Sequence, residues 1–241
     1  MPAGALERAV GLLDRLGQPG AKPTVAELAR ETDMPTSTVY RLLAELEQHG
    51  FVARTAGARV TLGARLIVLG QDAENGLRDR IVGPAAPVMR RLSRELGETV
   101  ILTARCGLET LALDVVEADR HSVRLSYACY RRGPLDRGAS AKVLAAWLPE
   151  EDQDRLLAAA ADAAGLAGAL AAIRRDGFAY TVGELDEGAA GVAAPILGPH
   201  RQLVAGLTVA GPADRIADQV DEIAAAVKAA AHRIERELPT A

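Results

Sequence analysis

The sequence predicts two domains in series, a mainly α-helical domain at the amino terminus and a larger α+β domain with an antiparallel sheet after it. Residues 5–50 carry apolar side chains at helical spacing between Gly- and Pro-containing breaks. Residues 100–209 instead mix short extended segments with helical ones, which favours a sheet flanked by helices. The 241 residues, of which 49% are hydrophobic, suffice for two cores.

Two amphipathic helices are expected first. The first covers residues 5–16 and ends at Gly17, because its apolar residues recur at helical spacing, at Leu6, Val10, Leu13 and Leu16. Thr24 is expected to cap the second helix, and Glu27 three residues later completes a capping box.

A third helix and a hairpin follow. Thr36 or Ser37 is expected to cap this helix, which ends at Gly50. The second and third helices, with a tight turn between them, have the dimensions of a helix-turn-helix. After Gly50 the pattern becomes extended over residues 51–54 and 59–62, which predicts a β-hairpin, or wing, with its turn at residues 56–57.

The charge distribution favours DNA as a partner of this domain. The net charge is −4, but residues 1–70 hold 8 Lys and Arg against 7 Asp and Glu, whereas residues 71–241 hold 20 against 25. No acid occurs at residues 34–44 or 48–71, where Arg41, Arg54, Arg59 and Arg65 all lie. A helical front end that docks on another protein is the alternative, but such a helix would not need this cationic, acid-free stretch.

The front of a recognition helix lies nearest the bases in the major groove. We therefore expect DNA contacts from residues at the start of the third helix and from two wing arginines on phosphates: Thr36, Ser37, Thr38, Tyr40, Arg41, Arg54 and Arg59. Two alternatives stay open. The wing arginines are also compatible with solvated surface positions, and Tyr40 with a core or phosphate-contacting role.

The remaining chain alternates helices and strands. A helix is expected over residues 64–75 as a linker, and another over 77–96 with an interruption at Pro84 and Pro87. Strands are expected at residues 100–105, 110–116, 123–128, 191–197 and 203–209, and helices at residues 139–148, 150–161, 166–175 and 213–237. The predicted organisation is 1–63 for the DNA-binding domain, 64–76 for the linker helix and 77–241 for the second domain.

Several motifs resemble the IclR family of bacterial transcription regulators. The amino-terminal part matches that family's DNA-binding domain at Thr24–Ala29, Met34–Leu46, Gly50–Val52 and Leu62–Gly63, although the family usually has a basic residue at the position of Thr36. The second part resembles its effector domain at Gly138–Pro149, Gly177–Tyr180, Glu184–Gly188, Val192–Ile196 and Ala205–Pro212. The resemblance implies a winged helix-turn-helix followed by an α+β GAF-like effector-binding domain. It also implies a regulator, either a repressor or an activator, that binds a double-stranded DNA operator as a homodimer or a dimer of dimers.

An effector pocket is expected between the sheet and the helix that begins near Ala139. Backbone N–H groups at a helix amino terminus bind carboxylates well, so a small carboxylate or an aromatic acid is the expected ligand. The resemblance implies that Ala139, Ser140, Thr181, Ala189, Gly191, Thr208 and Ala210 line the cavity, and Leu125 and Tyr127 are expected to add an apolar wall. Routine packing in a Gly- and Ala-rich chain is the alternative. Arg137 departs from the family pattern and either steers an anion or faces solvent.

The sequence does not indicate an enzyme. Ser140 and Lys142 superficially offer a nucleophile and a base, but positions i and i+2 of a helix point to different faces. The four histidines are far apart in sequence, so neither a metal nor another cofactor is expected. The acids Glu184, Asp186 and Glu187 are interpreted as solvated or ligand-orienting groups.

The two cysteines and the absence of long apolar stretches complete the prediction. Cys106 and Cys129 are too few for a disulfide framework and are expected to be buried apolar residues. No stretch reaches the roughly 18 uncharged apolar residues of a membrane span, and the amino terminus lacks a signal segment. We therefore expect a cytoplasmic protein with no membrane partner.

Overall fold

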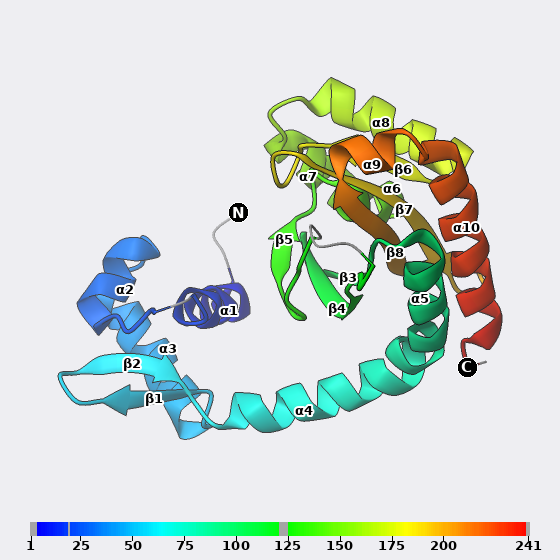
Figure 1. Cartoon of the computed structure of the whole chain (residues 1–241). Coiled ribbons are helices and arrows are strands. Elements are labelled where there is room, and N and C mark those ends of the chain that lie inside the picture. Colours follow the sequence, from blue (N-terminus) through cyan, green and yellow to red (C-terminus); the bar gives the residue numbers. More distant parts are fainter. Residues whose placement is uncertain (1–3, 19, 121–124, 240–241) are drawn as a thin grey trace. The chain divides into compact units, whose positions relative to one another are not determined.

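The computed structural model describes residues 4–18, 20–120 and 125–239. The chain divides into two compact units, residues 1–76 and 77–241 (Figure 1). None of the helices in the described residues is long and apolar enough to cross a membrane.

The first unit is a three-helix domain with a hairpin. It contains α1 (Ala5–Leu16), α2 (Val25–Glu31), α3 (Thr36–Gln48), β1 (Val52–Thr55) and β2 (Arg59–Leu62). Apolar residues from every element form one core, among them Leu12, Leu28, Val39, Leu43 and Val60. The predicted capping box is present, since Thr24 accepts the Glu27 N–H and the Glu27 carboxylate accepts the Thr24 N–H at 2.7 Å.

The start of α3 differs from the prediction. The N-cap residue is Pro35, and no side chain caps the helix, so the expected cap by Thr36 or Ser37 is wrong. The proline ring fixes φ at −56°, and its carbonyl accepts the N–H groups of Thr38 and Val39. Thr36 and Ser37 instead occupy the first turn with exposed side chains.

A helical segment leads from the first unit into the second. Helix α4 (Arg65–Leu77) continues through a π-helical turn, η1 (Arg78–Val82), into α5 (Gly83–Leu96). The predicted interruption therefore lies just before Pro84. Proline lacks an N–H, and in an α-helix its ring clashes with the carbonyl four residues earlier. In the π turn the Gly83 N–H bonds to the Arg78 carbonyl, five residues back. This wider turn gives the Pro84 ring room.

The second unit is built on an antiparallel sheet whose strands lie in the order β5-β4-β3-β8-β7-β6. These strands are β3 (Thr99–Cys106), β4 (Glu109–Val116), β5 (Arg132–Pro134), β6 (Ala179–Val182), β7 (Ala189–Leu197) and β8 (Leu203–Pro212). The predicted two-domain class, a helix-turn-helix domain followed by an α+β domain with an antiparallel sheet, is confirmed.

Helices cover both faces of this sheet. Helices α5 and α10 (Val220–Glu237) pack on one face, against inward residues such as Val100, Leu102 and Leu207. Helices α6 (Ala139–Ala146) and α8 (Ala163–Asp176) lie on the other face with α7 (Glu150–Ala159) beside α8 (Figure 1). Because side chains alternate along a strand, the residues between the inward ones point to the α6 side.

Three expectations for this unit were wrong. Residues 125–128 are not in a strand, while 123–124 lie outside the described residues. The Leu125 carbonyl accepts the Thr99 hydroxyl at 2.7 Å, and the backbone bonds to β4 at Tyr130 and Arg131, just before β5. The last helix is divided into α9 (Ala213–Ala217) and α10. Both cysteines are exposed, because Cys106 ends β3 beside a turn and Cys129 lies in the irregular segment.

Candidate functional site

Helix α3 presents one face to its own core and the other to solvent. Val39, Leu42 and Leu43 are buried, which fixes the helix on the domain. The front of the opposite face exposes Thr36, Ser37, Tyr40 and Arg41, with Thr38 half-buried. Tyr40 is 50% exposed, which excludes the alternative that it is a core residue.

The wing lies against this face through Tyr40 and Arg54. The Arg54 guanidinium lies over the Tyr40 ring, 5.9 Å from its centre, and its Nε donates to Glu47 Oε2 at 2.9 Å. Arg59 Nη1 donates to the Lys22 carbonyl at 2.5 Å. Arg41 forms an ion pair with Glu45 one turn along, at 3.1 Å. Exposed ion pairs of this kind contribute at most about 1 kcal/mol, so a phosphate or a base can replace them.

A cavity of about 150 Å³ lies in the second unit on the α6 side of the sheet. One water needs roughly 10–15 Å³ by this measure, so the cavity has room for a much larger molecule. Its wall contains most of the residues predicted for the effector site, namely Tyr127, Ala139, Ser140, Thr181, Ala189, Gly191, Thr208 and Ala210. Leu125 is not in the wall and packs beside Ile101 and Ala112 behind it.

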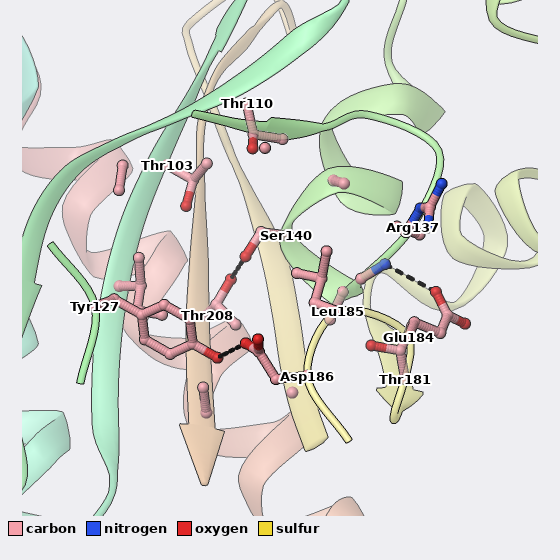
Figure 2. A pocket seen from close by; sticks show the side chains of 18 of the residues that line it. Thr103, Thr110, Tyr127, Arg137, Ser140, Thr181, Glu184, Leu185, Asp186 and Thr208 are labelled. Carbon is pink, nitrogen blue, oxygen red and sulfur yellow. Dashed lines mark hydrogen bonds between the residues drawn. The ribbon is translucent and has the colours of Figure 1, made fainter. Parts of the chain in front are cut away.

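Hydroxyl groups from four strands and α6 face this cavity. Ser140 Oγ and Thr208 Oγ1 form a hydrogen bond of 2.7 Å (Figure 2). Thr103 and Thr181 also line the cavity, although as residues they are only 4% and 8% exposed. Thr103 and Thr110 were not predicted from the sequence. No motif marks them, and only the register that pairs β3 with β8 and β4 brings them to this face.

The acidic loop between β6 and β7 closes one side of the cavity. Glu184 accepts the Gly138 N–H at 2.8 Å and forms an ion pair of 2.6 Å with Lys142. Asp186 accepts the Tyr127 hydroxyl at 3.3 Å (Figure 2). Burial, followed by the negative charge of Asp186, raises the pKa of Tyr127 to about 12. The amino end of α6, where a ligand carboxylate was expected, therefore already holds a carboxylate of the chain.

The side chains that suggested catalysis have separate partners. Ser140 contacts Thr208, whereas Lys142 contacts Glu184. No group of His, Cys, Asp and Glu in the described part of the chain could hold a metal ion.

A winged helix-turn-helix joined to an α+β domain defines a DNA-binding transcription regulator as the class of protein. The family models agree with this. The IclR helix-turn-helix domain matches residues 5–56, and the bacterial transcriptional regulator IclR C-terminal domain matches residues 78–236. The chain belongs to the IclR family of DNA-binding transcription regulators, and it is not an enzyme.

Relatives and solved structures match nearly the whole chain. The transcriptional regulator KipR of Bacillus subtilis is 33% identical, with 89% of each chain covered. The transcriptional repressor IclR of Escherichia coli is 28% identical over 95% of this chain and 88% of its own. A crystal structure of an IclR-type regulator from Silicibacter has a TM-score of 0.82 at 27% identity, with 98% of this chain and 100% of that chain covered. An IclR homologue from Microbacterium hydrocarbonoxydans, solved with 4-hydroxybenzoate, has a TM-score of 0.68 at 24% identity, with 98% and 99% covered.

Proposed function

We propose that this chain is a repressor whose affinity for its operator is controlled by an organic or aromatic acid bound in the cavity beneath α6. The observation that carries this proposal is the cavity itself, where hydroxyls from separate strands and α6 converge on one space. Ligand sites are mostly apolar hollows with a few convergent polar groups, which describes this cavity. The relative named as a repressor supports the proposed repression, and the homologue solved with 4-hydroxybenzoate supports the proposed acid ligand.

DNA is bound by the exposed front of α3, with the wing on the phosphates. Thr36, Ser37, Thr38, Tyr40 and Arg41 read or approach the bases, and Arg54 and Arg59 hold the backbone. An arginine can make two hydrogen bonds to guanine in the major groove, so Arg41 is the strongest candidate for base recognition. The regulator works in the cytoplasm as a homodimer or a dimer of dimers, because one such module covers too little DNA to be selective.

The DNA part is tested by footprinting the full chain on the DNA upstream of neighbouring genes. Arg41→Ala is expected to weaken specific binding by about 1–3 kcal/mol at near-physiological salt. Arg30→Ala, on the exposed side of α2, is the matched control and is expected to leave the footprint unchanged. Equal footprints for all three proteins would remove Arg41 from the interface.

The effector part is tested by thermal-shift screening of organic acids. Ser140→Trp is expected to fill the cavity, so an acid that stabilises the wild type should no longer stabilise this variant. The acid should also change the footprint of the wild type and leave that of the variant unaltered. An acid that stabilised both proteins equally would place its binding site elsewhere.

A further inference from the structure

The loop between β6 and β7, residues 183–188, forms one side of the cavity wall. It begins and ends at Gly183 and Gly188, whose φ angles of 66° and 74° lie in the left-handed region that favours glycine. The residues between them include Glu184, Leu185 and Asp186, which all line the cavity. Leu185 is nevertheless 49% exposed, so the loop covers the ligand space without an apolar anchor in the core.

Side chains tie this loop to the cavity at two points. The Glu184 carboxylate accepts the N–H of Gly138, the N-cap residue of the eight-residue helix α6, and pairs with Lys142 Nζ. Asp186 accepts the Tyr127 hydroxyl on the other side. Glu184 thus occupies the place where a helix amino terminus attracts an anion.

A second observation is that polar side chains from two further strands reach the cavity. Thr103 and Thr181 line it, and each is more than nine-tenths buried as a residue. A hydroxyl that reaches a cavity in this way can form a hydrogen bond to a ligand or to water there. The two threonines lie on different walls of the cavity, because Thr103 is on β3 and Thr181 is on the edge strand β6.

We infer that Glu184 holds the place of the effector's carboxylate, and that an acidic effector binds by displacing Glu184 and releasing the 183–188 loop. This inference rests on the proposed function. A ligand carboxylate would form the same charge-assisted hydrogen bond to the Gly138 N–H that Glu184 gives up, so the exchange itself is close to neutral. Net affinity then comes from the rest of the ligand, through the Thr103 and Thr181 hydroxyls.

Displacement also gives the bound acid a structural consequence. Leu185 Cδ1 lies 2.6 Å from the place that a Cβ at Gly138 would occupy, so its side chain sits against the start of α6 and moves with Glu184. The contact between Asp186 and Tyr127 lies two residues further along the same loop. The binding energy of the acid is in this way coupled to the conformation of the connection between β6 and β7.

The test is a calorimetric titration of the full chain with benzoate and 4-hydroxybenzoate, each paired with its neutral amide. Glu184→Gln removes the competing carboxylate and is expected to tighten acid binding by about tenfold while changing amide binding by less than about threefold. Glu187→Gln is the matched control. It makes the same charge change in the same loop at an exposed residue outside the cavity wall, and should leave both affinities unchanged.

The outcomes separate this inference from the proposed function. Equal acid affinity in the wild type and both glutamine variants, together with loss of binding in Ser140→Trp, would overturn displacement and leave the proposed function standing. Acid binding that Ser140→Trp does not reduce would instead contradict the proposed site. Failure of Glu184→Gln to bind either acid would also overturn the inference. If Glu184→Gln does not fold, Glu184→Asp, which shortens the side chain, should raise acid affinity by about threefold, and unchanged affinity would overturn it.

Discussion

At the residue scale, two threonines of β3 bury their hydroxyls with opposite results. Thr99 donates to the Leu125 carbonyl at 2.7 Å and accepts the Ala118 N–H at 3.4 Å. Thr103, four residues later on the same face, lines the cavity without such a partner. The first hydroxyl therefore holds the irregular segment after β4 to the sheet, whereas the second contributes only to the cavity.

Replacing each threonine by valine should show this difference. Thr99→Val is expected to lower the free energy of unfolding by about 1–3 kcal/mol, because it leaves a buried carbonyl and a buried N–H unpaired. Thr103→Val removes an unpaired hydroxyl and should change stability by less than about 0.5 kcal/mol, or raise it, while weakening effector binding. Urea unfolding of both variants measures this. A larger loss for Thr103→Val would mean that its hydroxyl has a partner.

The Tyr127 hydroxyl should ionise well above the ordinary pKa of a tyrosine. Burial and the nearby Asp186 carboxylate raise its pKa from 10.0 to about 12. A raised pKa means that the folded state favours the neutral phenol. The contribution to stability is fully present below pH 10 and is lost as the pH rises toward 12.

Absorbance at a phenolate wavelength, followed against pH, measures this ionisation. The late component should vanish in Tyr127→Phe and move to lower pH in Asp186→Asn, since one of the causes of the shift is removed. If Tyr127→Phe removed no late component from the titration, the contact with Asp186 would not persist in solution.

At the element scale, Gly63 joins the wing to α4. A Cβ added there would meet the Gly50 carbonyl group, with the carbonyl carbon at 2.8 Å, and backbone cannot move aside as a side chain can. Gly63→Ala should therefore destabilise the first unit by about 1–3 kcal/mol, as overpacking does. Gly70→Ala is the control, because it lies in α4 with open space around it and should stabilise by about 0.5–1 kcal/mol. Thermal unfolding of the two variants should move the midpoint in opposite directions.

Elements were predictable where the local pattern alone decides the structure. Helix α1 has the predicted bounds, because its apolar period is unbroken and Gly17 stops it. The strand expected at 123–128 is absent from its described residues, 125–128, because alternation cannot show that a distant hydroxyl, that of Thr99, takes the Leu125 carbonyl. Strands β5 and β6 were missed because they have only three and four residues, and β5 contains a glycine and a proline.

The two candidate sites differ in the same way in how far the sequence could predict them. The exposed face of α3 follows from helical period and charge, so its residues could be named in advance. The cavity depends on registers between strands far apart in sequence; the pairing of β3 with β8 sets Thr208 opposite Ile101, two residues from Thr103. Most residues of the cavity wall were predicted from the family resemblance. It could not show that Glu184 fills the amino end of α6, because that contact spans 46 residues and depends on one loop conformation.

At the scale of the whole molecule, the first unit exposes more apolar surface than a monomer needs. Helix α4 has no buried residue, and Ile67, Val68 and Leu69 are 68%, 59% and 43% exposed. Leu6 and Val10 of α1 are 79% and 47% exposed. Contiguous exposed apolar residues mark interaction surfaces, and burying one isoleucine or leucine fully stabilises by about 1.5–3 kcal/mol. We expect a second copy of the chain to cover this surface.

Ile67→Glu should therefore convert the dimer to a monomer or raise its dissociation constant steeply, because the partner would have to bury an unpaired carboxylate. The affinity for operator DNA should fall as the dimer is lost, since two helix-turn-helix modules are needed to span two half-sites about one helical turn apart. Sedimentation equilibrium gives the mass, and fluorescence anisotropy with operator DNA gives the affinity. Gln219→Glu, the same new charge at an exposed position of the second unit, outside the apolar residues of α1 and α4, should change neither quantity. A wild-type mass of one chain at micromolar concentration, with and without DNA, would contradict the dimer, and an unchanged mass for Ile67→Glu would move the interface away from α4.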